Sequence, residues 1–316
     1  MKLYRTLDEV IDAPPEGRVV AIGVFDGVHR GHQLILSQTI AQARASGALS
    51  TAVTFYPHPD AVLRPRSAPR MLTSLERKAE LLDALGIDEV VVVAFDRRFA
   101  SLSPELFCRA VLSDHLAAKV VFVGENFRFG HQGAGTPAHL ADYGSTHGFR
   151  VSPVQLVEDS GEVISSTRIR ELLRRGRVVE VTGLLGRPHR IEGEVVSGAR
   201  RGRTLEAPTA NLSVGREAAL PGLGIYVTRS VVDHDRVYHS VTSVGTNPTF
   251  EHDRKVRIET VLFDYNGDLY GSHLALDLLS RIRGQRAFAD ADRLADQIKK
   301  DIAAARRFHA GDLTSS

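Results

Sequence analysis

The sequence predicts two domains, a doubly wound α/β domain followed by an antiparallel sheet or small β-barrel. Three observations lead to this prediction. Short apolar, β-branched runs alternate with amphipathic segments in the first half of the chain. Closely spaced strand patterns with Gly, Asp and Asn turns follow after about residue 186. The length of 316 residues is sufficient for two domains of ordinary size.

In the first half, continuous apolar strands separated by helices are typical of a parallel sheet covered on both faces. The expected strands are 18–24 ("RVVAIGV"), 51–56 ("TAVTFY"), 89–95 ("EVVVVAF") and 119–124 ("KVVFVG"). Helical periodicity falls between them at 32–46, 74–85, 103–114 and near 136–147. Such a sheet binds its ligands at the carboxyl ends of the strands.

The second half is predicted to be antiparallel. Its expected strands are "RIEGEVVSG" (190–198), "IYVTRSVVD" (225–233), "RVYHSVTSVG" (236–245), "VRIETVLFD" (256–264) and "DLYGSHLALDLL" (268–279). A helix is expected at 290–308, with Leu294, Ile298 and Ile302 on one face. We place the boundary in "LLGRP", which gives domains 1–185 and 186–316.

Composition excludes several classes of protein. The 40 Lys and Arg nearly balance the 38 Asp and Glu, so no nucleic-acid partner is expected. The single cysteine, Cys108, excludes an intrachain disulfide and a cysteine-based metal cage. The first residues lack the apolar segment of a secretory signal, and the run "VVVVAF" (90–95) is too short to cross a bilayer. We therefore expect a cytoplasmic protein with no membrane partner.

The segment "GVFDGVHRGH" (23–32) follows the first expected strand and opens the first expected helix. Its glycines Gly23, Gly27 and Gly31 could serve the turn sterically or bring backbone N–H groups and a helix N-terminus to a phosphate. His29 and His32, three apart, can each donate a hydrogen bond to an anionic oxygen. Phosphate contact is favoured over zinc, because no third ligand is nearby in the sequence.

Two further features complete the chemistry of the first half. Asp26, in the same segment, is expected to fix the turn by a hydrogen bond. In "ISSTRIREL" (164–172), Ser165, Ser166 and Thr167 precede a helix whose first turn carries Arg168. One hydroxyl is explained by helix capping, whereas three hydroxyls with an arginine form a plausible phosphate clamp. Two phosphate sites on one domain indicate a polyphosphate substrate.

These motifs carry a resemblance to a known family. "GVFDGVHRGH" and "ISSTRIR" resemble the HxGH class of nucleotidyltransferases. "TFYPHP" (54–59) and "VGENFRFGHQGAGT" (123–136) narrow the resemblance to the adenylyltransferase half of the bacterial bifunctional riboflavin kinase/FAD synthetases. The resemblance implies that the phosphate of FMN attacks the α-phosphorus of ATP, which gives FAD and pyrophosphate. It also implies a Rossmann-like α/β nucleotidyltransferase fold for this domain.

The resemblance also implies roles for individual residues. His29 and His32 would bind the ATP phosphates and stabilise the transition state. The leaving pyrophosphate would be held by Ser165, Ser166, Thr167 and Arg168. The implied nucleotide- and phosphate-binding set is Gly23, Phe25, Asp26, Gly27, Gly31, Ser165, Ser166, Thr167 and Arg168. Asn126, Phe127 and Phe129 would lie at the nucleotide and flavin site, with core packing as the alternative for the two phenylalanines. Many members of the family have Asp in place of Asn126, which leaves the role of that residue open.

The segment "GARRGRTLEAPTANL" (198–212) carries the chemistry of the second domain. Taken alone, it favours a polar turn, although Thr209 and Asn211 offer the oxygen ligands that Mg²⁺ prefers. "PTAN" resembles the signature of the riboflavin kinase module, and "PGLGIYV", "SVGTNPTF" and "RIETVLFDYNGDLYG" follow in the order of that family. The resemblance then covers about 15–308 and implies a small antiparallel β-barrel kinase domain with a C-terminal helix.

The implied second reaction transfers a phosphoryl group from ATP to the 5′-hydroxyl of riboflavin. Glu259 would be the general base, while Thr209 and Asn211 would hold Mg²⁺. Gly198, Arg201 and Gly202 would bind the nucleotide. The family has Gly and an aromatic residue before "PTAN", where this chain has Glu206 and Ala207. A carboxylate beside ATP repels phosphate unless it turns away or pairs with Arg201 or Arg203, so a working kinase with weakened nucleotide affinity is predicted.

The sequence therefore predicts a Mg²⁺-dependent bifunctional enzyme that uses ATP to convert riboflavin to FMN and FMN to FAD. One alternative keeps only one of the two activities. Another is a catalytically inactive regulator that binds flavin or nucleotide, although a pure binder has no need of a base such as Glu259. The sequence leaves open whether the chain forms a homo-oligomer.

Overall fold

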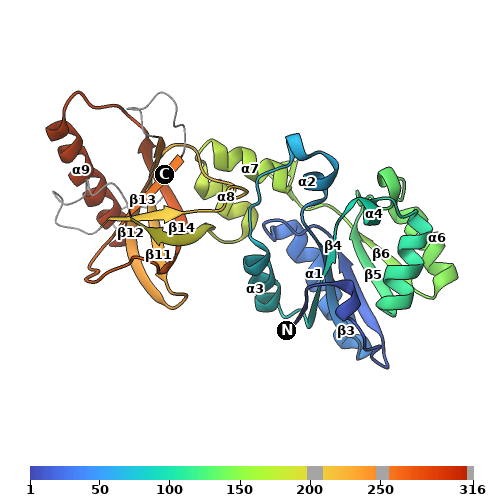
Figure 1. Ribbon diagram of the computed structural model, residues 1–316. Coiled ribbons are helices and arrows are strands. Elements are labelled where there is room, and N and C mark those ends of the chain that lie inside the picture. Colours follow the sequence, from blue (N-terminus) through green and yellow to red (C-terminus); the bar gives the residue numbers. More distant parts are fainter. Residues whose placement is uncertain (198–208, 247–255, 312–316) are drawn as a thin grey trace. The chain divides into compact units, whose positions relative to one another are not determined.

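The computed structural model describes residues 1–197, 209–246 and 256–311 (Figure 1). Contacts divide the chain into two compact units, Met1–Ser166 and Thr167–Ser316. This division lies N-terminal to the boundary between residues 185 and 186 that the sequence predicted, because helix α8 (Val178–Leu185) packs on strands of the second unit. Each unit has its own sheet and its own core.

Unit 1 contains a six-stranded parallel sheet in the order β1-β4-β3-β2-β5-β6. Its strands are β1 (Lys2–Tyr4), β2 (Arg18–Ile22), β3 (Leu49–Tyr56), β4 (Glu89–Ala94), β5 (Ala118–Gly124) and β6 (Arg150–Val154). The four central strands match the predicted ones, whereas the edge strands β1 and β6 were not predicted. A short hairpin, β7 (Glu158–Asp159) and β8 (Glu162–Val163), precedes the second motif.

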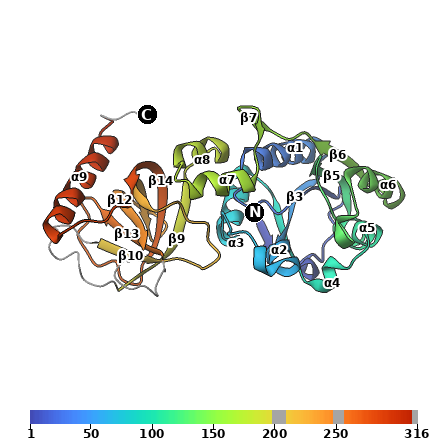
Figure 2. The same cartoon turned by 90° about the horizontal axis from the view of Figure 1, so that it is seen from above.

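Helices cover both faces of this sheet, as predicted for a doubly wound domain (Figures 1 and 2). Val19 and Ala21 of β2 pack in a core with α1 and α3, whereas Val20 and Ile22 pack in a second core with α5, η3 and α6. The larger helices are α1 (Arg30–Ser46), α3 (Leu75–Leu85), the π-helix η3 (Cys108–His115), which continues α5 (Pro104–Phe107), and α6 (Pro137–His147). Shorter ones are η1 (Leu7–Glu9), α2 (Pro59–Leu63), η2 (Pro65–Ser67), α4 (Arg97–Ala100) and η4 (His131–Gly133).

The strand order reverses beside β2. The chain adds β3 and β4 on one side of β2 and then places β5 and β6 on its other side. Doubly wound sheets bind ligands at the carboxyl ends of the strands next to such a reversal. Since β2 ends at Ile22, "GVFDGVHRGH" begins at that position.

Unit 2 is a closed antiparallel barrel in the order β10-β13-β12-β11-β14-β9. Its strands are β9 (His189–Val196), β10 (Thr209–Ser213), β11 (Gly224–Val232), β12 (Arg236–Thr246), β13 (Val256–Leu262) and β14 (His273–Gly284). The sequence predicted all of these except β10, which it treated as part of a polar turn. Two helices, α7 (Ser166–Arg174) and α8, precede the barrel.

Helix α9 (Ala291–His309) packs on the outside of the barrel, as predicted for 290–308. Of the predicted apolar face, Ile302 packs on the core beside buried Ala305 and Phe308, whereas Leu294 is 42% exposed. Buried Asp301 also lies on this face, where it pairs with Arg283 of β14 at 2.6 Å. Among the described residues, no helix is both long and apolar enough to cross a membrane.

Candidate phosphate-transfer sites

The turn after β2 is strained and tightly packed. Phe25 and Val28 have φ angles of 51° and 40°, in the left-handed region that non-glycine residues seldom adopt. Phe25 is fully buried, and a Cβ on Gly23 would lie 2.9 Å from its ring. The first glycine of the motif thus has the steric role that the sequence left open, and phosphate binding by its backbone stays a prediction.

The two histidines of the motif stack on each other at the start of α1. Their ring centroids are 3.6 Å apart, and His29 Nδ1 accepts the backbone N–H of His32 at 3.4 Å as the N-cap of the helix. Because Nδ1 of His29 is an acceptor, a neutral His29 carries its proton on Nε2 and can donate from that atom. A Cβ on Gly31 would lie 3.2 Å from the His29 ring, so glycine gives this ring room.

The environment of His32 keeps its imidazole neutral. Burial places the pKa of His32 well below 6.5, and the charges of His29 and Lys78 lower the pKa further. Its Nδ1 is buried and has no hydrogen-bond partner in the described part of the chain. An orphaned buried nitrogen beside a helix N-terminus is a feature that a bound ligand can complete.

Asp26 fixes the turn through hydrogen bonds to a segment far away in the sequence, whereas the sequence suggested a local Asx-type bond. The carboxylate is 1% exposed and accepts the backbone N–H groups of Leu72 at 2.9 Å and Thr73 at 3.2 Å. The Thr73 hydroxyl in turn accepts the N–H of Gly27 at 3.2 Å. The turn is therefore tied to the segment that leads into α3.

The structure brings part of "ISSTRIREL" (164–172) into contact with "GVFDGVHRGH" (23–32). Ser166 Oγ donates to the Asp26 carbonyl at 2.9 Å, and the Ile164 carbonyl lies 3.8 Å from the position of a Gly31 Cβ. Ser165 is half-buried just before the helix. Thr167 and Arg168 follow in the first turn of α7, and the division between the units falls directly before Thr167.

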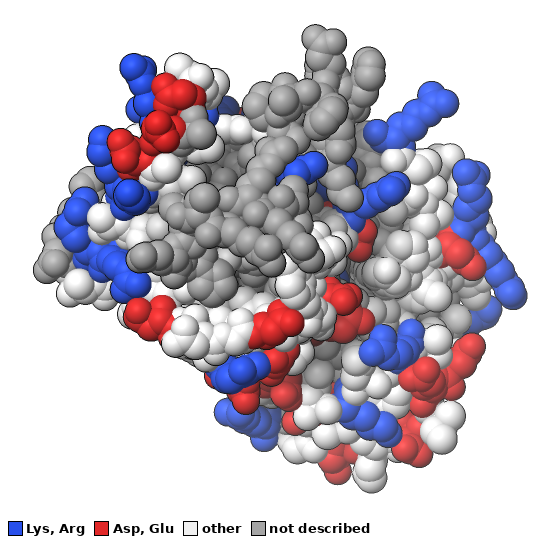
Figure 3. Space-filling view, turned by 60° about the vertical axis from the view of Figure 1, so that its left-hand side comes forward, with Lys and Arg blue, Asp and Glu red and all other residues white. Residues whose placement is uncertain are grey.

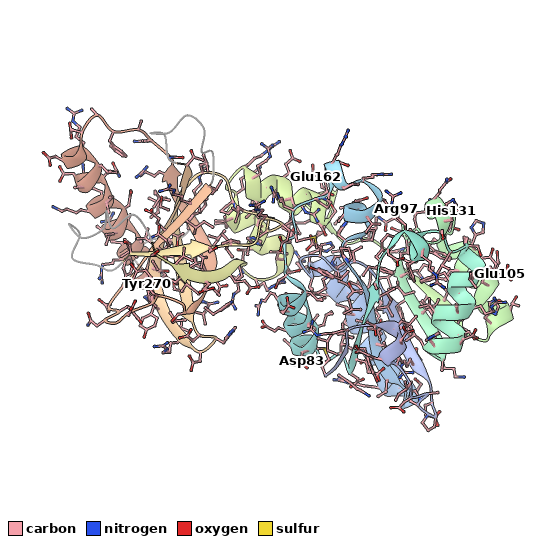
Figure 4. The ribbon with its side chains drawn as sticks, in the orientation of Figure 1. Asp83, Arg97, Glu105, His131, Glu162 and Tyr270 are labelled. Atoms are coloured by element: carbon pink, nitrogen blue, oxygen red, sulfur yellow. The ribbon has the colours of Figure 1, made fainter. Side chains whose placement is uncertain are left out.

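The predicted flavin residues follow β5. Asn126 is exposed in a turn, and the rings of Phe127 and Phe129 stack with centroids 5.6 Å apart. Phe129 is 7% exposed and packs against Phe107, so it is part of the core, whereas Phe127 is half-buried. Figure 4 labels His131, which marks the segment just after these rings.

In unit 2, the barrel register brings Asn211 and Glu259 together. These residues are directly opposite on β10 and β13, and Ser243 of β12 is opposite Glu259 on the other side. Thr209 lies two residues before Asn211, and so on the same face of β10. Glu259 is exposed, and Thr209 and Asn211 are half-buried. The predicted nucleotide residues Gly198, Arg201 and Gly202, and the pair Glu206 and Ala207, lie outside the described residues.

Sequence reasoning missed Lys78, which contacts the turn from α3. Its Nζ donates to the Val24 carbonyl at 2.7 Å. The signal was present in "LERKAELL", where a lysine occupies the apolar stripe of Leu75, Ala79 and Leu82. Within the described ranges, no cluster of three or more His, Cys, Asp or Glu side chains is placed to hold a metal ion.

Family models match both units. Residues 11–168 match the FAD synthetase model, and residues 185–309 match the riboflavin kinase model. An α/β domain that matches the FAD synthetase model, followed by a barrel that matches the riboflavin kinase model, defines a two-domain flavin nucleotide transferase.

Full-length relatives narrow this class. The chain is 37% identical over 308 residues to the bifunctional riboflavin kinase/FMN adenylyltransferase of Escherichia coli K12, covering 98% of both chains. It is 35% identical over 306 residues to the enzyme of that name from Listeria monocytogenes, covering 96% of both. The chain therefore belongs to the bifunctional riboflavin kinase/FMN adenylyltransferase family.

A solved structure extends the likeness to the whole fold. A crystal structure from Streptococcus pneumoniae, described as a macrolide-efflux protein, superposes with a TM-score of 0.84 at 32% identity. The match covers 96% of this chain and 98% of that one. Both units of the present chain thus have counterparts in a single solved chain.

Proposed function

We propose that the chain makes FAD from riboflavin in two ATP-dependent steps, each carried out at its own site. The observation that best supports this is the match to two family models, each over a region with a cluster of polar motif residues at one place in its fold. The domains proposed for the two steps remain 1–185 and 186–316. The family models end and begin at residues 168 and 185, which leaves most of α7 and most of α8 between them.

In the adenylyl-transfer step, an oxygen of the FMN phosphate attacks the α-phosphorus of ATP, and the bond to the β-phosphate breaks. The nucleophile is already ionised, so the site needs no base, and positioning and charge stabilisation supply the catalysis. His29 donates from Nε2, and His32 binds the phosphates as a neutral imidazole. The leaving pyrophosphate is held by Ser165, Ser166, Thr167 and Arg168.

The flavin of FMN is proposed to bind near Asn126 and Phe127. The half-buried ring of Phe127 offers an aromatic face, which a flat isoalloxazine can stack on. Phe129 acts indirectly, because this buried ring stacks on Phe127 and fixes its position. Asn126 is exposed beside them and can donate or accept a hydrogen bond.

In the phosphorylation step, the riboflavin hydroxyl attacks the γ-phosphorus of ATP. Glu259 accepts the proton of that hydroxyl, and ADP leaves. Thr209 and Asn211 fit a Mg²⁺ ion, because their oxygen atoms share a face of β10 and Asn211 is paired with Glu259. When bound, Mg²⁺ neutralises charge on the ATP phosphates.

The direct test is incubation of the pure protein with riboflavin, ATP and Mg²⁺, followed by chromatographic separation of the flavins. The proposal expects FMN first and FAD later. FMN alone, or FAD only when FMN is supplied, would restrict the function to one half. Binding of flavin with no turnover would instead support the inactive regulator.

Other expectations remain predictions. These are a cytoplasmic location and the lack of nucleic-acid or membrane partners. On the face seen in Figure 3, basic and acidic side chains are interspersed, which is consistent with a protein that does not bind nucleic acid there. The oligomeric state can be measured by light scattering.

A further inference from the structure

The side chain of Lys78 places a buried ammonium group against the turn that "GVFDGVHRGH" forms after β2. Lys78 lies in the first part of α3, the helix that carries Asp83, which Figure 4 labels. The residue is 3% exposed. Its Nζ donates to the Val24 carbonyl at 2.7 Å and to Thr54 Oγ1 at 3.1 Å, and Thr54 Oγ1 donates to the same carbonyl at 2.9 Å. Burying an ammonium is costly unless it is hydrogen-bonded, and these two bonds tie the buried charge to the Val24 carbonyl and to β3.

The carbonyl that Lys78 binds stands at the start of the strained part of the turn. Phe25 follows it with a φ of 51°, and a side chain in this region persists only where its surroundings hold it. Asp26 comes next, held by the N–H groups of Leu72 and Thr73. Groups from α3 and the segment before it therefore hold the chain on both sides of Phe25.

Lys78 also acts on His32 through its charge. The cationic side chain is one of three causes that keep the pKa of His32 low, after burial and the neighbouring His29. The edge of the His32 ring packs on Phe25 at a centroid distance of 5.3 Å, so the turn and the imidazole are also in contact. Lys78 is thus bonded to the turn on which the His32 ring packs, and its charge adds to the lowering of the His32 pKa.

We propose that Lys78 is a positioning residue for adenylyl transfer, which holds the Val24–Asp26 turn in place and so supports the ring of His32 that packs on Phe25. This inference rests on the proposed function, because it assumes that His32 binds the ATP phosphates. Lys78 acts indirectly, through its hydrogen bond to the Val24 carbonyl and its charge near His32. Loss of its side chain or of its charge should therefore weaken adenylyl transfer and leave the kinase reaction of the other domain intact.

The pH dependence follows from the charge. Burial lowers the pKa of Lys78 from 10.5 to about 8, and the opposite charge of Asp26 limits the decrease. The titratable groups that face it are Asp26 from the turn and His32 from α1, while β3 presents the neutral Thr54. A lysine with a lowered pKa loses its charge as pH rises through that pKa, and the uncharged amine makes a weaker hydrogen bond to the Val24 carbonyl. The kcat/KM for ATP in FMN adenylylation should therefore fall above about pH 8.

The experiment compares Lys78→Met with wild type in both half-reactions. We expect Lys78→Met to lower kcat/KM for FMN adenylylation at least tenfold at pH 7, to abolish the decrease near pH 8, and to raise the pKa of His32 measured by NMR. Riboflavin phosphorylation by the same preparation should stay within twofold and reports folding of the second domain. Lys119→Met, which removes an exposed lysine of β5, is the matched control and should be unchanged.

Lys78→Arg keeps the inference testable if Lys78→Met does not fold. Arginine remains charged at high pH, so this variant should lose the decrease near pH 8 and leave the pKa of His32 low. Unchanged kinetics and an unchanged pH profile in Lys78→Met would overturn the inference. A lower rate with the same pH profile and the same His32 pKa would also overturn it, because the role would then be structural only.

His32→Ala separates this inference from the proposed function. If His32→Ala still makes FAD at the wild-type rate, the proposed site itself is wrong. If His32→Ala loses FAD formation while Lys78→Met behaves as wild type, the site stands and only the role of Lys78 fails.

Discussion

The two proposed sites differ in how deeply the protein buries them. In unit 1, His29 and Asp26 are almost fully buried, a lysine lies beneath the turn, and the motif is linked to β3 and to the segment before α3. In unit 2, Glu259 is exposed on the barrel, and its alignment with Asn211 comes from strand register. One site is built by a packed turn, and the other by neighbouring strands.

The difference matches the two nucleophiles. A phosphate nucleophile is ionised already, so a site that only positions charges can be buried and rigid. A hydroxyl nucleophile has to lose a proton, so its site needs a carboxylate within reach of the substrate. Substitutions at the two sites should therefore impair different reactions.

The largest expected effect is that of Glu259→Gln on riboflavin phosphorylation. Removing a general base lowers such rates by roughly 10²–10⁴-fold. FAD formation from supplied FMN should be unchanged in the same preparation, measured by chromatography. A parallel loss of both reactions in folded protein would show that the sites are not separate.

His29→Ala should lower FAD formation by about 10²–10³-fold, the usual effect of removing a positioned donor to a transition state. FMN should accumulate from riboflavin at the normal rate. The matched control is His115→Ala, which removes an exposed histidine of η3 far along the chain from the motifs. Undiminished FAD formation in His29→Ala would remove this residue from the chemistry.

Gly23→Ala tests the packed turn. Its Cβ would meet the Phe25 ring at 2.9 Å, and overpacking a buried ring destabilises by about 1–3 kcal/mol. We expect a lower Tm for the transition of unit 1, measured by calorimetry, and slower FAD formation. Gly183→Ala in α8 is the control, because nothing lies within 4 Å of its added Cβ and the change should stabilise the helix. A Tm of Gly23→Ala at or above that of wild type would contradict the packing argument.

The smallest effect is expected for Glu206→Gly. The resemblance implies that Glu206 lies beside ATP, so removing its carboxylate should lower the KM for ATP in riboflavin phosphorylation by about fivefold, since a screened charge pair contributes about 1 kcal/mol. The KM for ATP in FMN adenylylation is the internal control. An unchanged kinase KM would mean that Glu206 does not affect nucleotide binding.

Much of the fold was predictable because its signals are local and strong. The central strands of unit 1 are continuous β-branched runs, which only a sheet covered on both faces buries. The edge strand β1 has only three residues, and β6 contains Pro153, so neither gives a clear pattern. Strand β10 is short and carries polar Thr209 and Asn211, which conceal its pairing with β13.

The site was predictable as motifs and not as contacts. Residue types at fixed spacing drew attention to His29 and His32 and to the three hydroxyl residues 165–167 at the start of α7. The tie from Ser166 to the Asp26 carbonyl spans 140 residues and depends on tertiary packing. Lys78 was overlooked because charged residues in helices are usually exposed, and only the packing of α3 makes this one buried.

The most direct test of two separable sites mixes two variants in one reaction. His29→Ala and Glu259→Gln are each incubated alone, and then together, with riboflavin, ATP and Mg²⁺, and FAD is followed by chromatography. The account predicts little FAD from either variant alone, and rapid FAD formation in the mixture, because FMN made by one variant is adenylylated by the other. A mixture that makes no more FAD than the two variants separately would contradict it.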